Sequence, residues 1–108
     1  CFMIELDSVE RANDWMRDNS IRLAQAKANR IYIDKYLKSK LGELFLVAPE
    51  GSVASKEAWS YCHTDYIELL EGLKAAVEQE TELQHKYTAA EVKIAIWRTL
   101  QANQRGLV

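Results

Sequence analysis

The sequence has few of the residues that interrupt helices. Its 108 residues include four glycines and one proline. Because these two residues are the usual punctuation of turns and loops, their scarcity predicts a chain that is mostly helical. No apolar run approaches the ~20 residues that a membrane-spanning helix requires, and no signal peptide is visible. We therefore expect a single helical domain over residues 1–108 that has no membrane contact.

Cysteine and net charge are also low. Cys1 and Cys62 are the two cysteines, and two cysteines so far apart do not make a disulfide framework, so we expect a reducing, cytoplasmic setting. A net charge of −2 does not by itself indicate nucleic acid. Because the chain starts with cysteine, three interpretations stay open: Cys1-Phe2 precedes a true start at Met3, the chain is part of a longer one, or Cys1 is the lipidated first residue of a lipoprotein.

Catalytic signatures are missing as well. The sequence contains no glycine-rich phosphate loop, no Gly-x-Ser-x-Gly and no His-Glu-x-x-His. Cys62, His63 and Asp65 lack the ligand spacing of a zinc site. Glu82 and His85 match the Glu-x-x-His motif of di-iron bundles once, whereas such a site needs two copies, which a dimer would have to supply. We expect no enzyme activity, no metal, no cofactor and no small-molecule substrate.

Apolar residues recur in steps of three and four from residue 9 to residue 47, which predicts one long amphipathic helix starting at Asp7 or Ser8. Asp7 and Glu10 have capping-box spacing. A second stripe, which includes Trp15, Ile31, Tyr36 and Leu41, widens the apolar face. The predicted seam consists of Val9, Ala12, Met16, Asn19, Leu23, Ala26, Arg30, Ile33, Leu37, Lys40, Leu44 and Val47.

The clearest break lies at residues 48–52, where proline and glycine follow each other closely. Ser55 is the expected N-cap of a short helix over residues 56–62, and Thr64 of a long helix over residues 65–103. Thr88 and Glu91 form a possible second capping box, but the apolar phase runs through Thr88 and favours a continuous helix. Its seam consists of Tyr66, Leu69, Leu73, Ala76, Glu80, Leu83, Tyr87, Ala90, Ile94, Trp97 and Gln101, flanked by Leu70, Val77 and Ile96.

Two long helices joined by a compact turn should fold back antiparallel. Residues 17–40 carry seven basic and two acidic groups, and residues 43–82 carry nine acidic and two basic groups. A hairpin brings residues 30–40 opposite residues 73–83, which places basic groups beside acidic ones. The predicted fold is all-α: an antiparallel hairpin of two long amphipathic helices with a short intervening helix. Because a lone hairpin leaves apolar stripes uncovered, we expect it to assemble into an oligomeric bundle, as a homo-oligomer.

Two sets of residues are candidates for binding. Large apolar side chains at seam positions and near the turn are the expected interface: Trp15, Leu23, Ile33, Leu37, Trp59, Leu73, Tyr87 and Trp97. Basic residues that the hairpin gathers at the end away from the turn are the expected nucleic-acid contacts: Arg17, Arg22, Lys27, Lys86, Lys93, Arg98 and Arg105.

Three segments resemble stretches of small helical proteins encoded by tailed bacteriophages and prophages: Glu10-Arg-Ala-Asn-Asp-Trp-Met-Arg-Asp-Asn19, Glu68-Leu-Leu-Glu-Gly-Leu-Lys-Ala-Ala-Val77 and Ile96-Trp-Arg-Thr-Leu-Gln-Ala-Asn-Gln-Arg105. The resemblance implies a setting in phage DNA recombination or replication inside a bacterial host cell, without catalytic residues. The predicted function is therefore a non-enzymatic helical binding protein whose partner is a protein of DNA metabolism. The alternatives are direct DNA binding through the basic end, or inhibition of a host DNA-processing enzyme through the acidic residues 43–82.

Overall fold

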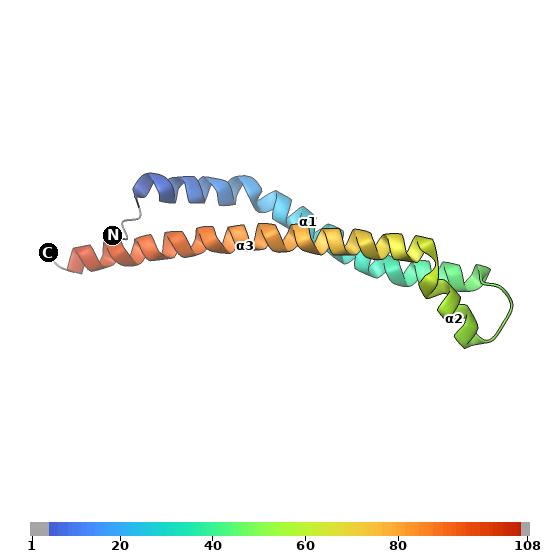
Figure 1. Cartoon of the computed structure of the whole chain (residues 1–108). Helices are drawn as coiled ribbons and strands as arrows, with labels where there is room; N and C mark the ends of the chain where they lie inside the picture. Colours follow the sequence, from blue (N-terminus) through green and yellow to red (C-terminus); the bar gives the residue numbers. More distant parts are fainter. Residues whose placement is uncertain (1–4, 107–108) are drawn as a thin grey trace. The chain divides into compact units, whose positions relative to one another are not determined.

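The computed structural model describes residues 5–106, and these form three helices (Figure 1). The helices are α1 (Leu6–Val47), α2 (Val53–Cys62) and α3 (Thr64–Gly106), and the part of the chain from 5 to 106 contains no strand. The all-α prediction is thus confirmed, as is the continuity of the last helix through Thr88. The expectations about Cys1-Phe2 lie outside the described residues.

The start of α1 differs from the expected capping box. The helix already includes Leu6, and the backbone N–H of Val9 donates to the carbonyl of Glu5 at 3.2 Å. Asp7 therefore lies inside the first turn, where its carboxylate contacts Arg11 at 3.1 Å and complements the positive end of the helix dipole. Asp7 is not the N-cap, because the helix begins before it.

The N-cap of α2 also differs from the predicted residue. Ser52, and not Ser55, is the N-cap: its backbone is extended, and its side chain accepts a hydrogen bond from the N–H of Ser55 at 3.1 Å. Ser52 directly follows Gly51 at the end of the turn, so its hydroxyl reaches an amide that the helix itself leaves unpaired. Consequently α2 begins at Val53, three residues before its expected start.

The N-cap of α3 is likewise not the predicted residue. His63 has an extended backbone, with φ −68° and ψ 138°, and its carbonyl accepts from the N–H of Ile67 at 3.1 Å. Its imidazole Nδ1 accepts from the N–H of Asp65 at 3.1 Å. His63 therefore caps the helix, and Thr64, the expected cap, is its first helical residue.

Contacts between helices group into two units, each of which combines part of α1 with part of α3. In the first unit, residues 6–24 of α1 pack against residues 81–106 of α3, with Val9, Leu83 and Ala90 buried. Lys93 donates to the hydroxyl of Ser8 at 2.9 Å. Every buried residue of this unit is a predicted seam residue, so the hydrophobic period did locate its core.

The second unit comprises residues 25–80, which include all of α2. Its buried apolar residues are Ala26, Leu37, Leu44 and Ala76, again all from the predicted seams. Ser60 of α2 is the most deeply buried side chain, and its hydroxyl donates to the carbonyl of Lys56 at 2.8 Å. This bond satisfies the hydroxyl within its own helix, so that α2 can bury a small polar residue at little cost.

The last residue of the predicted α1 seam, Val47, is not buried. Val47 is 70% exposed, although the apolar period includes it. Lys40 lies level with Asp65, since their side chains are 3.6 Å apart. Val47 is seven residues further along α1 than Lys40, whereas α3 begins only one residue before Asp65. The antiparallel partner has therefore already ended where Val47 would need it.

Candidate interaction surface

A polar pair lies inside the seam of the second unit. Arg30 and Glu80 each interrupt the apolar period, and the Arg30 guanidinium donates from Nε and Nη2 to the two carboxylate oxygens of Glu80. The side chain of Arg30 is 33% exposed and that of Glu80 is 19% exposed. The hydrogen bond to Glu80 raises the pKa of Arg30 despite its partial desolvation. Arg30 and Glu80, the polar residues that interrupt the two apolar seams, thus neutralise each other's charge. A bidentate pair of this kind aligns α1 with α3 in one register.

Lys40 is the second polar seam residue of this unit. Its ammonium lies 3.3 Å from Glu43 on α1 and 3.6 Å from Asp65 on α3. The hydrogen bond to Glu43 raises the pKa of Lys40, and the charge of Asp65 adds to the effect. Because one ammonium contacts both carboxylates, Glu43 and Asp65 lie on the same side of the seam. This contact shows that the residue directly before a seam position on α1 and the one directly before a seam position on α3 lie on the same flank of the hairpin.

The raised pKa of Lys40 predicts a pH dependence of stability. The folded state holds this proton more tightly than the unfolded state does. Lys40 therefore adds its full stabilisation to the free energy of unfolding below its ordinary pKa of 10.5, and this stabilisation is lost as the pH rises through the higher folded-state pKa. Urea unfolding between about pH 8 and pH 12 should show wild type losing its advantage over Lys40→Met above pH 10.5. A difference between the two proteins that is constant over that range would contradict the assignment.

The opposite flank of the same unit carries apolar side chains between charged ones. Glu43 and Asp65 each come directly before a seam residue, whereas Leu41, Leu70 and Val77 each come directly after one. These latter residues therefore lie on the other side of the hairpin. Ile67 lies three residues before Leu70, and Ile31 lies three residues before Asp34, which directly follows the seam residue Ile33. Residues at that spacing are neighbours on a helix surface, so both isoleucines lie on this flank. We call this surface the Leu70 face; it consists of Ile31, Leu41, Ile67, Leu70 and Val77.

The Leu70 face is accessible on α3. Ile67 is 46% exposed, and Leu70 and Val77 are each 41% exposed. Single exposed apolar side chains are ordinary on protein surfaces, but three of them on one flank of α3, beside two half-buried ones on the neighbouring helix, form an apolar stripe that Lys74 interrupts between Leu70 and Val77. A stripe of this kind is suited to bind another apolar helix face.

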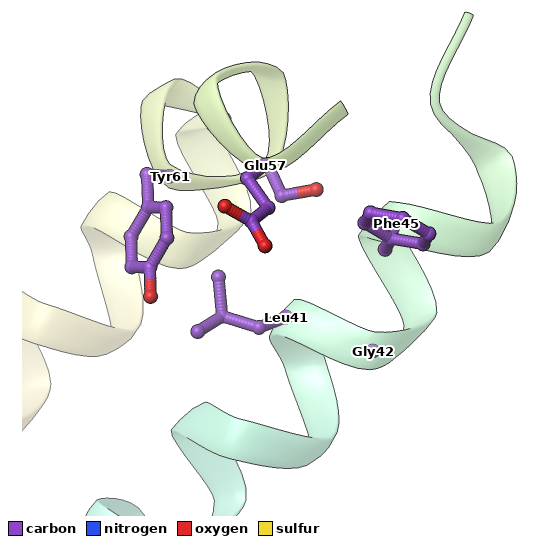
Figure 2. A pocket seen from close by; sticks show the side chains of 6 residues that line it. Leu41, Gly42, Phe45, Glu57 and Tyr61 are labelled. Carbon is purple, nitrogen blue, oxygen red and sulfur yellow. The ribbon is translucent and has the colours of Figure 1, made fainter. Parts of the chain in front are cut away.

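A shallow cavity lies at the α2 end of this face (Figure 2). Leu41, Gly42 and Phe45 of α1 line one side, and Glu57 and Tyr61 of α2 line the other. Its volume is about 240 Å³, below the range of typical small-molecule sites. Lys56 Nζ lies 5.6 Å from the centroid of the Phe45 ring, a cation–π distance that links α2 to α1. The cavity is large enough for one side chain of a partner.

The predicted interface residues lie mostly inside the hairpin. Leu37 is buried, and six others on α1 and α3 are half-buried at or beside the seam: Trp15, Leu23, Ile33, Leu73, Tyr87 and Trp97. Trp59 of α2 is also half-buried, with its ring centroid 5.0 Å from that of His63. These side chains contribute to packing within each unit. The more accessible apolar residues are the flanking ones, of which the sequence pattern had singled out Leu70 and Val77 as neighbours of the seam.

The predicted nucleic-acid contacts are divided between the units. Six belong to the first unit and one to the second: Arg17, Arg22, Lys86, Lys93, Arg98 and Arg105 in the first, and Lys27 in the second.

Several of these basic groups already contact polar neighbours. Arg17 lies 3.4 Å from Asp14 and 3.2 Å from Asp18, and Lys86 lies 3.0 Å from Glu82. The described residues of the first unit carry seven basic and seven acidic groups, so the unit has no net charge. Counterion release, which drives non-specific DNA binding, requires unneutralised positive charge. DNA binding through this end stays a prediction.

Neither a metal site nor a membrane-spanning helix is found in the described part of the chain. Over residues 5–106, no three His, Cys, Asp or Glu side chains gather closely enough to hold a metal ion. None of the helices in this part of the chain is long and apolar enough to cross a membrane. Comparison of the chain with family models, curated proteins and solved structures finds no match.

Proposed function

We propose that the chain is a non-enzymatic helical binding protein that acts through protein–protein contacts, in the setting of phage DNA metabolism that its phage-like segments imply. The observation that supports this proposal is the Leu70 face, an accessible apolar stripe along a helical hairpin. Burial of half-exposed Leu or Val side chains contributes about 1 kcal/mol each. The three more exposed residues, Ile67, Leu70 and Val77, together with the less exposed Ile31 and Leu41, thus contribute a few kcal/mol toward reversible association, against the entropy that association costs.

The alternative functions make different demands on the surface. Direct DNA binding requires the predicted basic contacts, six of which lie in the first unit, and inhibition of a host enzyme requires the acidic residues 43–82. Neither uses Leu70 or Val77. Variants on the Leu70 face therefore separate the proposed function from both alternatives.

The test is the double substitution Leu70→Glu and Val77→Glu. We expect wild type to associate, with itself or with a protein retained from a bacterial host extract, and the double variant to lose at least tenfold in affinity, because two charges then occupy the apolar stripe. Size-exclusion chromatography with light scattering measures the first case, and retention on immobilised protein measures the second.

The matched control is Tyr32→Glu with Val92→Glu. Tyr32 is 67% exposed and Val92 is 50% exposed, and neither belongs to the Leu70 face, so their substitution should leave association unchanged. A wild-type protein that is a monodisperse monomer and retains no partner would overturn the proposed function. Binding to single- or double-stranded DNA that ignores the Leu70 variants would favour the direct DNA-binding alternative instead.

A further inference from the structure

We infer that the Leu70 face binds a second copy of this chain, and that the two copies are related by a twofold axis parallel to the helices. This inference rests on the proposed function and names its partner. The residues that carry it are the charges along the two edges of the Leu70 face, whose net sign differs between α1 and α3. All of them belong to the second unit.

The α1 edge has a net positive charge although it includes Asp34, and the α3 edge has a net negative charge although it includes Lys74. Lys35 and Lys38 are exposed on α1, within four residues of Ile31 or Leu41, and Glu71 and Glu78 are exposed on α3, each next to Leu70 or Val77. None of the four forms an ion pair within residues 5–106. With Asp34 and Lys74 included, each edge still presents one net charge, positive on α1 and negative on α3, to whatever covers the face.

Only one of two possible symmetric arrangements satisfies these charges. A twofold axis perpendicular to the helices would place α1 on α1 and α3 on α3, which opposes lysine to lysine and glutamate to glutamate. A twofold axis parallel to the helices instead places each α1 on the α3 of the other copy. Since a twofold interface repeats every contact, both edges then meet a charge of opposite sign.

The positions along the helices also agree with this arrangement. Within one copy, Arg30 lies level with Glu80, and Lys40 lies level with Asp65. A parallel axis moves the second copy across without shifting it along the helices, so α1 meets the other α3 near the same level. Lys38 then lies close to Glu71 of the second copy, and Leu41 close to Leu70 of the second copy.

Charge exchange tests the inference. Variant one carries Lys35→Glu and Lys38→Glu, and variant two carries Glu71→Lys and Glu78→Lys. By sedimentation equilibrium at low ionic strength, where charges are least screened, we expect each variant alone to dimerise about tenfold or more weakly than wild type. An equimolar mixture should dimerise about as tightly as wild type, because both repeated contacts then pair lysine with glutamate.

Two controls accompany the mixture. Circular dichroism should show unchanged helix content, since Lys and Glu have similar helix propensities and all four positions are exposed. Arg98→Glu with Arg105→Glu changes net charge as variant one does but lies in the first unit. This control should dimerise like wild type. Its mixed dimer with variant two pairs lysine with glutamate at only one of the two repeated contacts, so it should be weaker than the mixed dimer of variants one and two.

Three outcomes would overturn the inference. A wild-type monomer under all conditions would do so, although the proposed function would stand if Leu70→Glu with Val77→Glu still abolished binding to another protein. Dimerisation that is insensitive to all four charges would leave the function intact but assign the interface elsewhere. A mixture that dimerises more tightly than wild type would show that α1 packs on α1 and α3 on α3.

Discussion

Replacing Leu44 with alanine should lower the free energy of unfolding by about 3 kcal/mol. Leu44 is 4% exposed and is among the most deeply buried apolar residues. Its truncation removes burial of apolar surface and leaves a cavity where the end of α1 meets the other helices of the second unit, and a long narrow seam has few neighbouring layers to compensate. Urea unfolding followed by circular dichroism measures the change.

Leu46 provides the matched control, because it is the same residue type on the same helix but is 85% exposed. Leu46→Ala should change the free energy of unfolding by no more than about 0.5 kcal/mol. If the two substitutions had equal effects, the seam described here would not be the one that stabilises the second unit.

Reversal of a single charge at the Arg30–Glu80 pair should have the second large effect. Arg30→Glu would place two carboxylates side by side in a half-buried seam, where neither is fully hydrated and each loses its hydrogen-bond donor. We expect a clearly lower urea midpoint at neutral pH. Because protonation of one carboxylate relieves the repulsion, the loss should be smaller at about pH 4 than at pH 7.

The double exchange Arg30→Glu with Glu80→Arg is the control for this prediction. It restores one positive and one negative group at the same two positions, so it should recover at least half of the lost midpoint. A double variant no more stable than Arg30→Glu would indicate that the two residues do not interact as a pair. The pair also bears on function, because it sets the level of α1 against α3 on which the charge match of the Leu70 face depends.

The Leu70 face was only partly predictable from the sequence. Leu70 and Val77 flank the apolar period of the last helix, and Ile31 and Leu41 flank that of the first, so a wide apolar face was evident in both. The pattern could not say which residues the hairpin covers itself and which remain available. That distinction depends on the register of α1 against α3. In the observed register, the large seam residues, such as Leu37 and Leu73, lie largely inside the hairpin rather than on its surface.

The three caps show a related limit. Asp7, Ser55 and Thr64 all have side chains that favour helix starts, yet the helices begin beside other residues. Several residues near each start could act as the cap, and their preferences differ by only about 1 kcal/mol. The turn between α1 and α2, and the corner at His63, therefore determine which side chain reaches a free amide.

The order of residues by itself determined the three helices, the break after Val47 and the antiparallel seam, because helix formation and amphipathic periodicity are local properties of the chain. Only the tertiary structure decided that Arg30 meets Glu80, that Lys40 meets Asp65, and that Val47 lies beyond the reach of α3. These outcomes depend on how far one helix is shifted along the other, and that shift is set by contacts between residues far apart in the sequence. The same shift brings the basic edge of α1 and the acidic edge of α3 to one level beside the Leu70 face.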